Sequence, residues 1–135
     1  MPDAIEKVAW IHLDAGRLLT ARTHGRERFY LPGGKPEPGE TIEQTLVREV
    51  REELGITLDS STITPLLVVE ARADGEPTGT IVRTVCRTAV PTGTPLPCSE
   101  IAEIAHLAHG DRPRASATTR EVLDRLAATG RLLRW

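Results

Sequence analysis

The sequence is poor in cysteine, aromatic residues and lysine, and it contains no long hydrophobic run. Two of its 135 residues are cysteines, and aromatic residues make up 3%. A small secreted domain held by disulfides carries more cysteine, and the spacing of Cys86 and Cys98 is not that of a metal site. No apolar run reaches the length of a membrane span, and residues 1–7 lack the basic and apolar regions of a signal peptide. We therefore expect a soluble cytoplasmic protein with no membrane partner.

Net charge and length further narrow the class of protein and the number of domains. The apolar share of 39% and the charged share of 27% are ordinary for a globular protein. The net charge of −2 lacks the basic excess of a dedicated nucleic-acid binder, so no stable nucleic-acid partner is expected. The chain has no internal repeat, and its length suits one core. Residues 1–135 are thus predicted to form a single domain.

The pattern of apolar and turn-forming residues predicts the order strands, helix, strands, helix. That order indicates an α+β fold with a mixed β-sheet and helices packed against its faces. Thr41 is the expected N-cap of the first helix, and Gly55 its C-terminal stop. A hairpin turn is expected at 74–79 and loops at 35–40 and 91–98. The expected strands are 8–12, 17–22, 29–31, 63–73, 80–90 and 101–107, and the expected helices are 41–54 and 118–128.

The first predicted helix carries a cluster of acids. Glu49, Glu52 and Glu53 are spaced i, i+3 and i+4, which gathers their carboxylates on one helical face. Three close negative charges repel one another unless a cation lies among them, and Mg²⁺ or Mn²⁺ suits oxygen ligands. The alternative is a solvated acidic face paired with Arg48 and Arg51. Beside the acids runs an apolar stripe that can pack on a sheet, formed by Leu46, Val47, Val50 and Leu54.

The residues around this helix favour the cation site over the solvated face. The segment Gly33–Ile56 reads GGKPEPGETIEQTLVREVREELGI and resembles the signature box of the Nudix hydrolases, which spans 34–56 here. The resemblance implies a Nudix-like α/β/α sandwich with a mixed β-sheet and a central catalytic helix. It also implies an enzyme that cuts diphosphate linkages. The box positions are all filled, by Gly34, Glu40, Arg48, Glu49, Val50, Glu52, Glu53, Gly55 and Ile56.

The same resemblance assigns roles to the acids. The three helix glutamates would hold Mg²⁺, or Mn²⁺, with help from the Gly34 carbonyl, while Glu40 and Arg48 would hold the loop on the helix. Either Glu53, Glu52 or an acid from a later loop would take the proton of the attacking water. For that later acid Glu100 is better placed than Glu103, although Glu100 equally fits an ordinary exposed loop acid.

The substrate is predicted less directly. The phrase Pro-Gly-Gly-Lys resembles the mutator-type branch, which removes oxidised nucleoside triphosphates. Lys35 would neutralise a phosphate, and Arg22 would contact the substrate or lie solvated at a strand end. The expected reaction converts a (d)NTP, or an oxidised one, to a monophosphate and pyrophosphate. The segment 70–74 lacks the proline typical of the ADP-ribose branch, and Tyr30 is the only tyrosine, whereas the diadenosine polyphosphate branch tends to carry one past the box.

Two other functions remain open. One is a pyrophosphatase for ADP-ribose or another nucleotide sugar. The other is a nucleotide-binding sensor without turnover, a class that usually loses the box glutamates, all of which are present here. Analogy with the family also suggests a homodimer.

Overall fold

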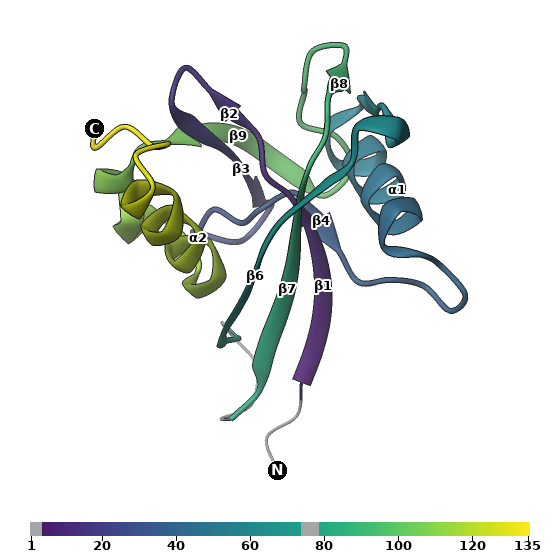
Figure 1. Cartoon of the computed structure of the whole chain (residues 1–135), viewed down its shortest axis with the longest axis horizontal. Coiled ribbons are helices and arrows are strands. Elements are labelled where there is room, and N and C mark those ends of the chain that lie inside the picture. The colour runs from purple at the N-terminus through teal and green to yellow at the C-terminus, as the bar shows by residue number, and fades with distance from the viewer. Residues whose placement is uncertain (1–3, 74–78) are drawn as a thin grey trace.

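The computed structural model describes residues 4–73 and 79–135. In the described chain the strands form three sheets (Figure 1). The largest has the order β4-β1-β7-β6, the second the order β2-β3-β9, and the third pairs β5 with β8. The strands are β1 (Ala4–Trp10), β2 (Leu13–Asp14), β3 (Arg17–Thr23), β4 (Gly33–Gly34), β5 (Thr57–Leu58), β6 (Thr64–Arg72), β7 (Ile81–Thr88), β8 (Pro91–Thr92) and β9 (Ile101–Leu107).

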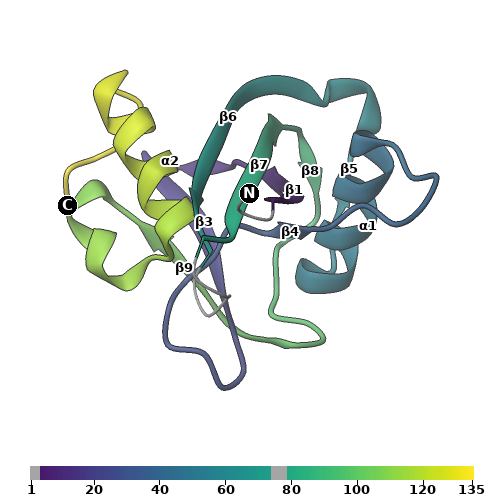
Figure 2. The same cartoon turned by 90° about the horizontal axis from the view of Figure 1, so that it is seen from below.

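The largest sheet is mixed, as the sequence predicted. Strands β1 and β7 run parallel, whereas β4 and β6 are antiparallel to their neighbours. Helices α1 (Ile42–Leu54) and α2 (Ala117–Ala128) lie on opposite sides of the sheets (Figures 1 and 2). Two short 3₁₀ helices, η1 (Ser60–Thr62) and η2 (His109–Arg114), complete the fold. Within the described residues no helix is long and apolar enough to cross a membrane.

Strand β1 serves two cores because consecutive strand residues point to opposite faces. Val8 and Trp10 pack in the core under α1. Ala9 and the following residue, Ile11, pack in the core under α2. All four side chains are buried. The continuous apolar run at 8–11 is therefore the signature of a strand covered on both faces.

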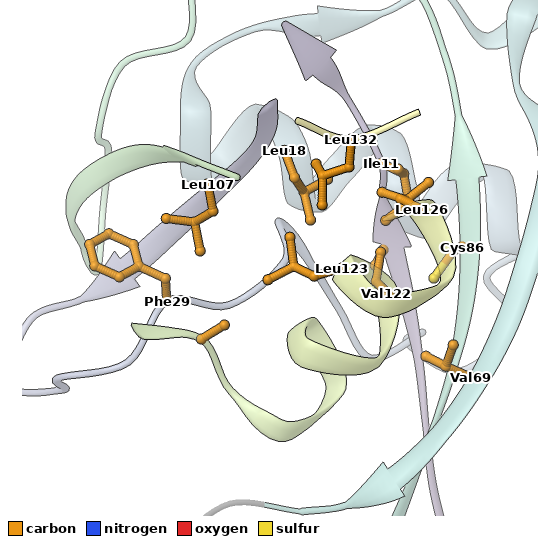
Figure 3. Packing of buried hydrophobic residues seen from close by; sticks show 12 residues of the cluster. Ile11, Leu18, Phe29, Val69, Cys86, Leu107, Val122, Leu123, Leu126 and Leu132 are labelled. Carbon is orange, nitrogen blue, oxygen red and sulfur yellow. The ribbon is translucent and has the colours of Figure 1, made fainter. Parts of the chain in front are cut away.

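The core under α2 joins both larger sheets to the C-terminal helix (Figure 3). From α2, Val122, Leu123 and Leu126 are fully or almost fully buried. They meet Leu18 and Leu107, which come from strands paired antiparallel. Helix α2 thus holds the second sheet against the first. A cavity lies between the two sheets.

The ends of α1 are fixed as the sequence predicted. The Thr41 side chain accepts a hydrogen bond from the backbone N–H of Gln44, and the Gln44 side chain accepts one from the backbone of Thr41. At the other end Gly55 adopts a left-handed conformation with φ 69° and donates to the Arg51 carbonyl. Such a φ favours glycine because it has no Cβ. Helix α2 begins after Ser116, one residue before the expected start at 118.

Other boundaries differ from the prediction. The expected strand 29–31 is reduced to isolated bridges of Tyr30 with Ala21 and of Phe29 with Ala115, since the following Pro32 has no N–H to extend a ladder. Strand β1 starts earlier than 8 because its parallel pairing with β7 extends to Ala4. The loop expected at 91–98 contains the two residues of β8. Positions 74–78 of the expected hairpin turn lie outside the described residues.

Candidate active site

The three glutamates of α1 share a face but not an environment. A helix turns by about 100° per residue, so Glu53 lies about 40° to one side of Glu49 and Glu52 about 60° to the other. Glu53 is only 8% exposed, and the Glu49 side chain is 16% exposed. The Glu52 side chain is 54% exposed, with an oxygen 3.6 Å from the Arg48 guanidinium. The helix therefore turns two acids inward and leaves the third in solvent.

Glu53 joins the helix to the strand that precedes it. Its Oε1 accepts a hydrogen bond from the backbone N–H of Gly33 at 3.0 Å. Burial raises the pKa of Glu53 to about 8, and the negative charges of Glu49 and Glu100 add to the shift against the opposing Gly33 hydrogen bond. A carboxylate in this position is costly to ionise unless a positive charge lies beside it.

Glu49 lies against the backbone of β4. A Cβ at Gly34 would lie 2.6 Å from the Glu49 Cδ, so only glycine leaves room for this carboxylate. Burial raises the pKa of Glu49, and the charges of Glu52 and Glu100 do the same, while the hydrogen bond from Arg48 opposes them. Glycine is thus required at position 34 for a local steric reason, because the Glu49 carboxylate lies directly against the backbone there.

Arg48 holds the loop 35–40 on the helix, as expected. Its Nε donates to Glu40 at 2.6 Å, and its terminal nitrogens donate to Glu40, to Glu49 and to the Lys35 carbonyl. The Arg48 hydrogen bond, helped by those from the Glu37 backbone and the Thr45 hydroxyl, lowers the pKa of Glu40 to about 2. This paired arginine also fixes one oxygen of Glu49 and so orients the other.

The loop before β9 reaches the acids through the end of α1. The last carbonyls of a helix have no partner inside it. Here Cys98 donates its N–H to the Glu53 carbonyl and Leu96 donates to the Leu54 carbonyl, each at 3.0 Å. Glu100 follows, close enough for its charge to raise the pKa of both Glu49 and Glu53. Glu103 lies elsewhere and forms an ion pair with Arg22 at 2.8 Å.

These residues fit a divalent cation whose remaining coordination positions would be filled by waters and by phosphate oxygens of a ligand. Among the described residues, no group of three acidic, histidine or cysteine side chains could hold a metal by itself. Mg²⁺, however, is usually bound by one or two carboxylates together with waters and substrate phosphates. Glu49 supplies a half-buried carboxylate and Glu53 a buried one, and the pKa of each is raised. A cation between them would relieve their repulsion.

A cavity of about 310 Å³ opens beside Glu53, between the two larger sheets. Gly33, Gly34 and Glu53 line one part of it, and the rest is lined by β1, β3, β6, β7, β9, the loop between β3 and β4 and the start of α2. Its volume lies within the range of small-molecule sites. Polar and apolar residues share its wall, and the polar ones are Lys7, Thr23, Arg26, Tyr30, Glu53, Arg72, Thr84, Ser116, Thr118 and Thr119.

The two basic residues expected to contact the substrate do not line this cavity. Arg22 donates to Glu103 and to the Arg26 carbonyl, and Lys35 is exposed on the loop held by Arg48. Their contact with a substrate stays a prediction. Arg26 and Thr84 do line the cavity, and sequence analysis missed both. No sequence motif marks Arg26, which lies in a polar loop. Thr84 is a single polar residue in an apolar strand, and its spacing from other polar residues gives no signal.

Comparison with known proteins places this geometry in context. The model of the NUDIX domain family matches residues 6–126. The 8-oxo-dGDP phosphatase NUDT18 of Mus musculus is 39% identical over 99 residues, which cover 73% of this chain and 28% of that protein. The 8-oxo-dGTP diphosphatase of Escherichia coli strain K12 is 54% identical over 37 residues, or 27% of this chain and 29% of its own. The chain thus spans less than a third of the length of these two relatives in the matched regions.

Solved structures agree on the fold. The crystal structure of a MutT NUDIX hydrolase from Burkholderia pseudomallei superposes with a TM-score of 0.76 at 24% identity, covering 92% of this chain and 98% of that one. At this identity the likeness concerns the arrangement of the backbone, which carries the same α/β/α architecture.

Proposed function

Because the chain belongs to the Nudix family, we propose that it is a Mg²⁺-dependent hydrolase of a nucleotide diphosphate linkage, with Mn²⁺ as a substitute ion. The observation that carries the proposal is the pairing of Glu49 and Glu53 next to the cavity and against Gly33 and Gly34. The two acids, with the Gly34 carbonyl and with Glu52 where its exposed side chain turns inward, would hold the ion. A bound divalent cation would screen the phosphate charge and favour ionisation of a water.

The chain's own groups then have distinct tasks. In hydrolysis the oxygen of a water forms a bond to phosphorus, and the bridging P–O bond of the anhydride breaks, leaving the electron pair on the departing phosphate. The water proton passes to a carboxylate. We assign this base to Glu100, because it is exposed to solvent, carries a charge felt by both inner acids and is not tied to Arg48. Glu53 and Glu52 are the other candidates, as proton acceptors in place of ligands.

The substrate that we propose is a (d)NTP or oxidised (d)NTP, cut to a monophosphate and pyrophosphate. The mutator-type Pro-Gly-Gly-Lys phrase supports this class, and so do the names of the two relatives, which act on 8-oxo-dGDP and 8-oxo-dGTP. The basic Arg26 on the cavity wall suits an anionic ligand. Since one relative is named for a diphosphate, the triphosphate and the diphosphate have to be compared directly.

The test is a panel of nucleotides with products identified by mass. Purified protein is incubated with Mg²⁺ or Mn²⁺ and with dGTP, 8-oxo-dGTP, 8-oxo-dGDP or ADP-ribose, in water enriched in ¹⁸O. We expect a monophosphate and pyrophosphate from the triphosphates, no reaction with excess chelator, and one ¹⁸O atom in one product. Glu49→Gln is the inactive control, and Glu43→Gln, an exposed acid on the same helix, is the active one. Efficient cleavage of ADP-ribose without turnover of any nucleoside triphosphate would show that the substrate class is wrong.

A further inference from the structure

One buried hydroxyl on the cavity wall has no partner. Thr84, in β7, is 2% exposed, and its Oγ1 is the buried side-chain polar atom that lacks a hydrogen bond among the described residues. Other fully buried threonines are paired. Thr20 donates to the Ala105 carbonyl, and Thr45 donates to Glu40.

A hydroxyl in this state costs free energy that a valine of the same shape would avoid, because the group has lost water and gained nothing. Such groups in folded proteins call for an explanation, and a ligand is one. Thr84 lines the same cavity as Glu53, so a molecule held there would lie against this side chain. The cavity side of β7 would then be incomplete until the ligand binds.

The surroundings of Thr84 describe the part of the ligand that it meets. Lys7 is its register partner on β1 and lines the same cavity. Ile5 and Val82, which also line it, provide apolar surface on the same two strands. Apolar surface beside a few polar groups is typical of the part of a ligand pocket that orients a small molecule.

The position also fits the far end of a nucleotide. Gly34 pairs with Val8 of β1 on one side, and β7 pairs with β1 on the other. Neighbouring strands are about 4.8 Å apart, so Thr84 lies roughly 10 Å across the sheet from Gly34. A nucleotide with its phosphates beside Glu53 and the Gly33–Gly34 backbone would extend its base toward β7.

On these grounds, and resting on the proposed function, we infer that Thr84 and Lys7 recognise a carbonyl oxygen on the base of the substrate. Lysine has only donors to offer, whereas a hydroxyl both donates and accepts. Guanine and thymine present a carbonyl oxygen where adenine presents an amino group, which is a donor. The pair therefore selects bases that present a carbonyl oxygen over adenine.

The inference is tested with Thr84→Val, which removes the hydroxyl and keeps the shape, and with Thr84→Ser, which keeps the hydroxyl. Lys7→Met removes the second group. Thr20→Val is the matched control, since it removes a buried hydroxyl that points away from the cavity lining. Steady-state kcat and KM are measured for dGTP and dATP, and dissociation constants of dGMP and dAMP are measured by calorimetry without metal.

We expect Thr84→Val to raise KM for dGTP and the Kd of dGMP about fivefold to tenfold, the size of one neutral hydrogen bond. The values for dATP and dAMP should stay within about twofold, kcat should be unchanged, and Thr84→Ser should restore the preference. Lys7→Met should shift the preference in the same direction as Thr84→Val. Thr20→Val should leave the preference for dGMP unchanged while it lowers the melting temperature.

The outcomes separate this inference from the proposed function. If the wild type hydrolyses no nucleoside triphosphate, the proposed function fails, and the binding of dGMP over dAMP with its loss in Thr84→Val still supports the inference. Equal effects on both bases, no effect, or no binding of either monophosphate by the wild type would overturn the inference. Should Thr84→Val not fold, Lys7→Met decides, because it removes one of the two groups, and an unchanged preference for dGMP over dAMP in that variant would overturn the inference.

Discussion

The Oε1 atom of Glu53 accepts a hydrogen bond at 3.0 Å from the backbone N–H of Gly33. This contact fixes the C-terminal half of α1 against β4, and β4 in turn pairs with β1 in the largest sheet. The acid is therefore placed by two elements, and it lines the cavity.

Glu53→Gln should abolish most turnover while the protein stays folded. Glutamine keeps an oxygen to accept from Gly33 but removes the negative charge that would hold the cation. Loss of metal-based stabilisation commonly removes several kcal/mol, and each 1.36 kcal/mol is about tenfold in rate, so kcat should fall by about a hundredfold or more. We expect Glu52→Gln to lower kcat as well. Steady-state kinetics with circular dichroism checks both, and kcat of Glu53→Gln within about threefold of wild type would contradict the assignment.

Mg²⁺ should stabilise the folded protein even without a substrate. The half-buried Glu49 and the buried Glu53 repel each other when both are ionised, and a ligand that binds only the native state raises its stability. The melting temperature should rise by a few degrees in millimolar Mg²⁺ and return to its original value with excess chelator. The double variant Glu49→Gln/Glu53→Gln should show no such rise. An equal rise in wild type and double variant would place the binding of Mg²⁺ elsewhere.

Gly34→Ala should damage activity more than stability. A Cβ there would lie 2.6 Å from the Glu49 Cδ, so the carboxylate has to move away from the position beside β4. We expect kcat/KM to fall by about tenfold or more, because misplacement of a catalytic group by a small distance is costly. The melting temperature should change by only a few degrees, since one side chain can rotate to make room. Unchanged kcat/KM would mean that the approach of Glu49 to the strand has no role in turnover.

The loop that contains Glu40 should contribute stability that depends on pH. The pKa of Glu40 is lowered to about 2 from an ordinary value of 4.5, mainly by the Arg48 hydrogen bond. A lowered acid pKa means that this stabilisation is fully present above about pH 4.5 and is lost as the pH falls toward 2. Glu40→Gln should therefore be less stable than wild type to urea at pH 7, and the difference should shrink at pH 4 and at pH 3. Glu43→Gln, which changes an exposed acid, should show no comparable trend.

Arg26→Ala should raise KM for a nucleoside triphosphate more than Arg22→Ala does. Arg26 lines the cavity, whereas Arg22 is held by Glu103 and by the Arg26 carbonyl. Larger effects on KM of Arg22→Ala than of Arg26→Ala would restore the contact first expected for Arg22.

Lys35→Ala should also raise KM with little change of melting temperature. The exposed loop lysine packs against little, and its charge acts on a nearby phosphate.

The sequence predicted the parts of this protein that depend on local spacing. The capping residues Thr41 and Gly55 lie where the pattern indicated. From the apolar stripe Leu46, Val50 and Leu54 are buried as expected and Val47 only partly, and of the acidic face Glu52 is exposed. Pairings between distant segments were less accurate. The extension of β1 to Ala4 and the loss of a strand at 29–31 depend on partners that no local window contains.

Taken alone, the sequence determined the family and the set of acids, because a helical repeat and a loop of glycines and prolines can be read over 23 neighbouring positions (34–56). Only the tertiary structure decided which acids are buried. Glu53 turns toward β4 and Glu52 toward solvent because the sheet covers one side of α1. It also decided that Glu100 lies beside acids 47 or more positions earlier in the chain, and that Thr84 faces a cavity without a partner. Burial and charge proximity are properties of packed surfaces, and their cost or gain exists only once distant segments exclude water together.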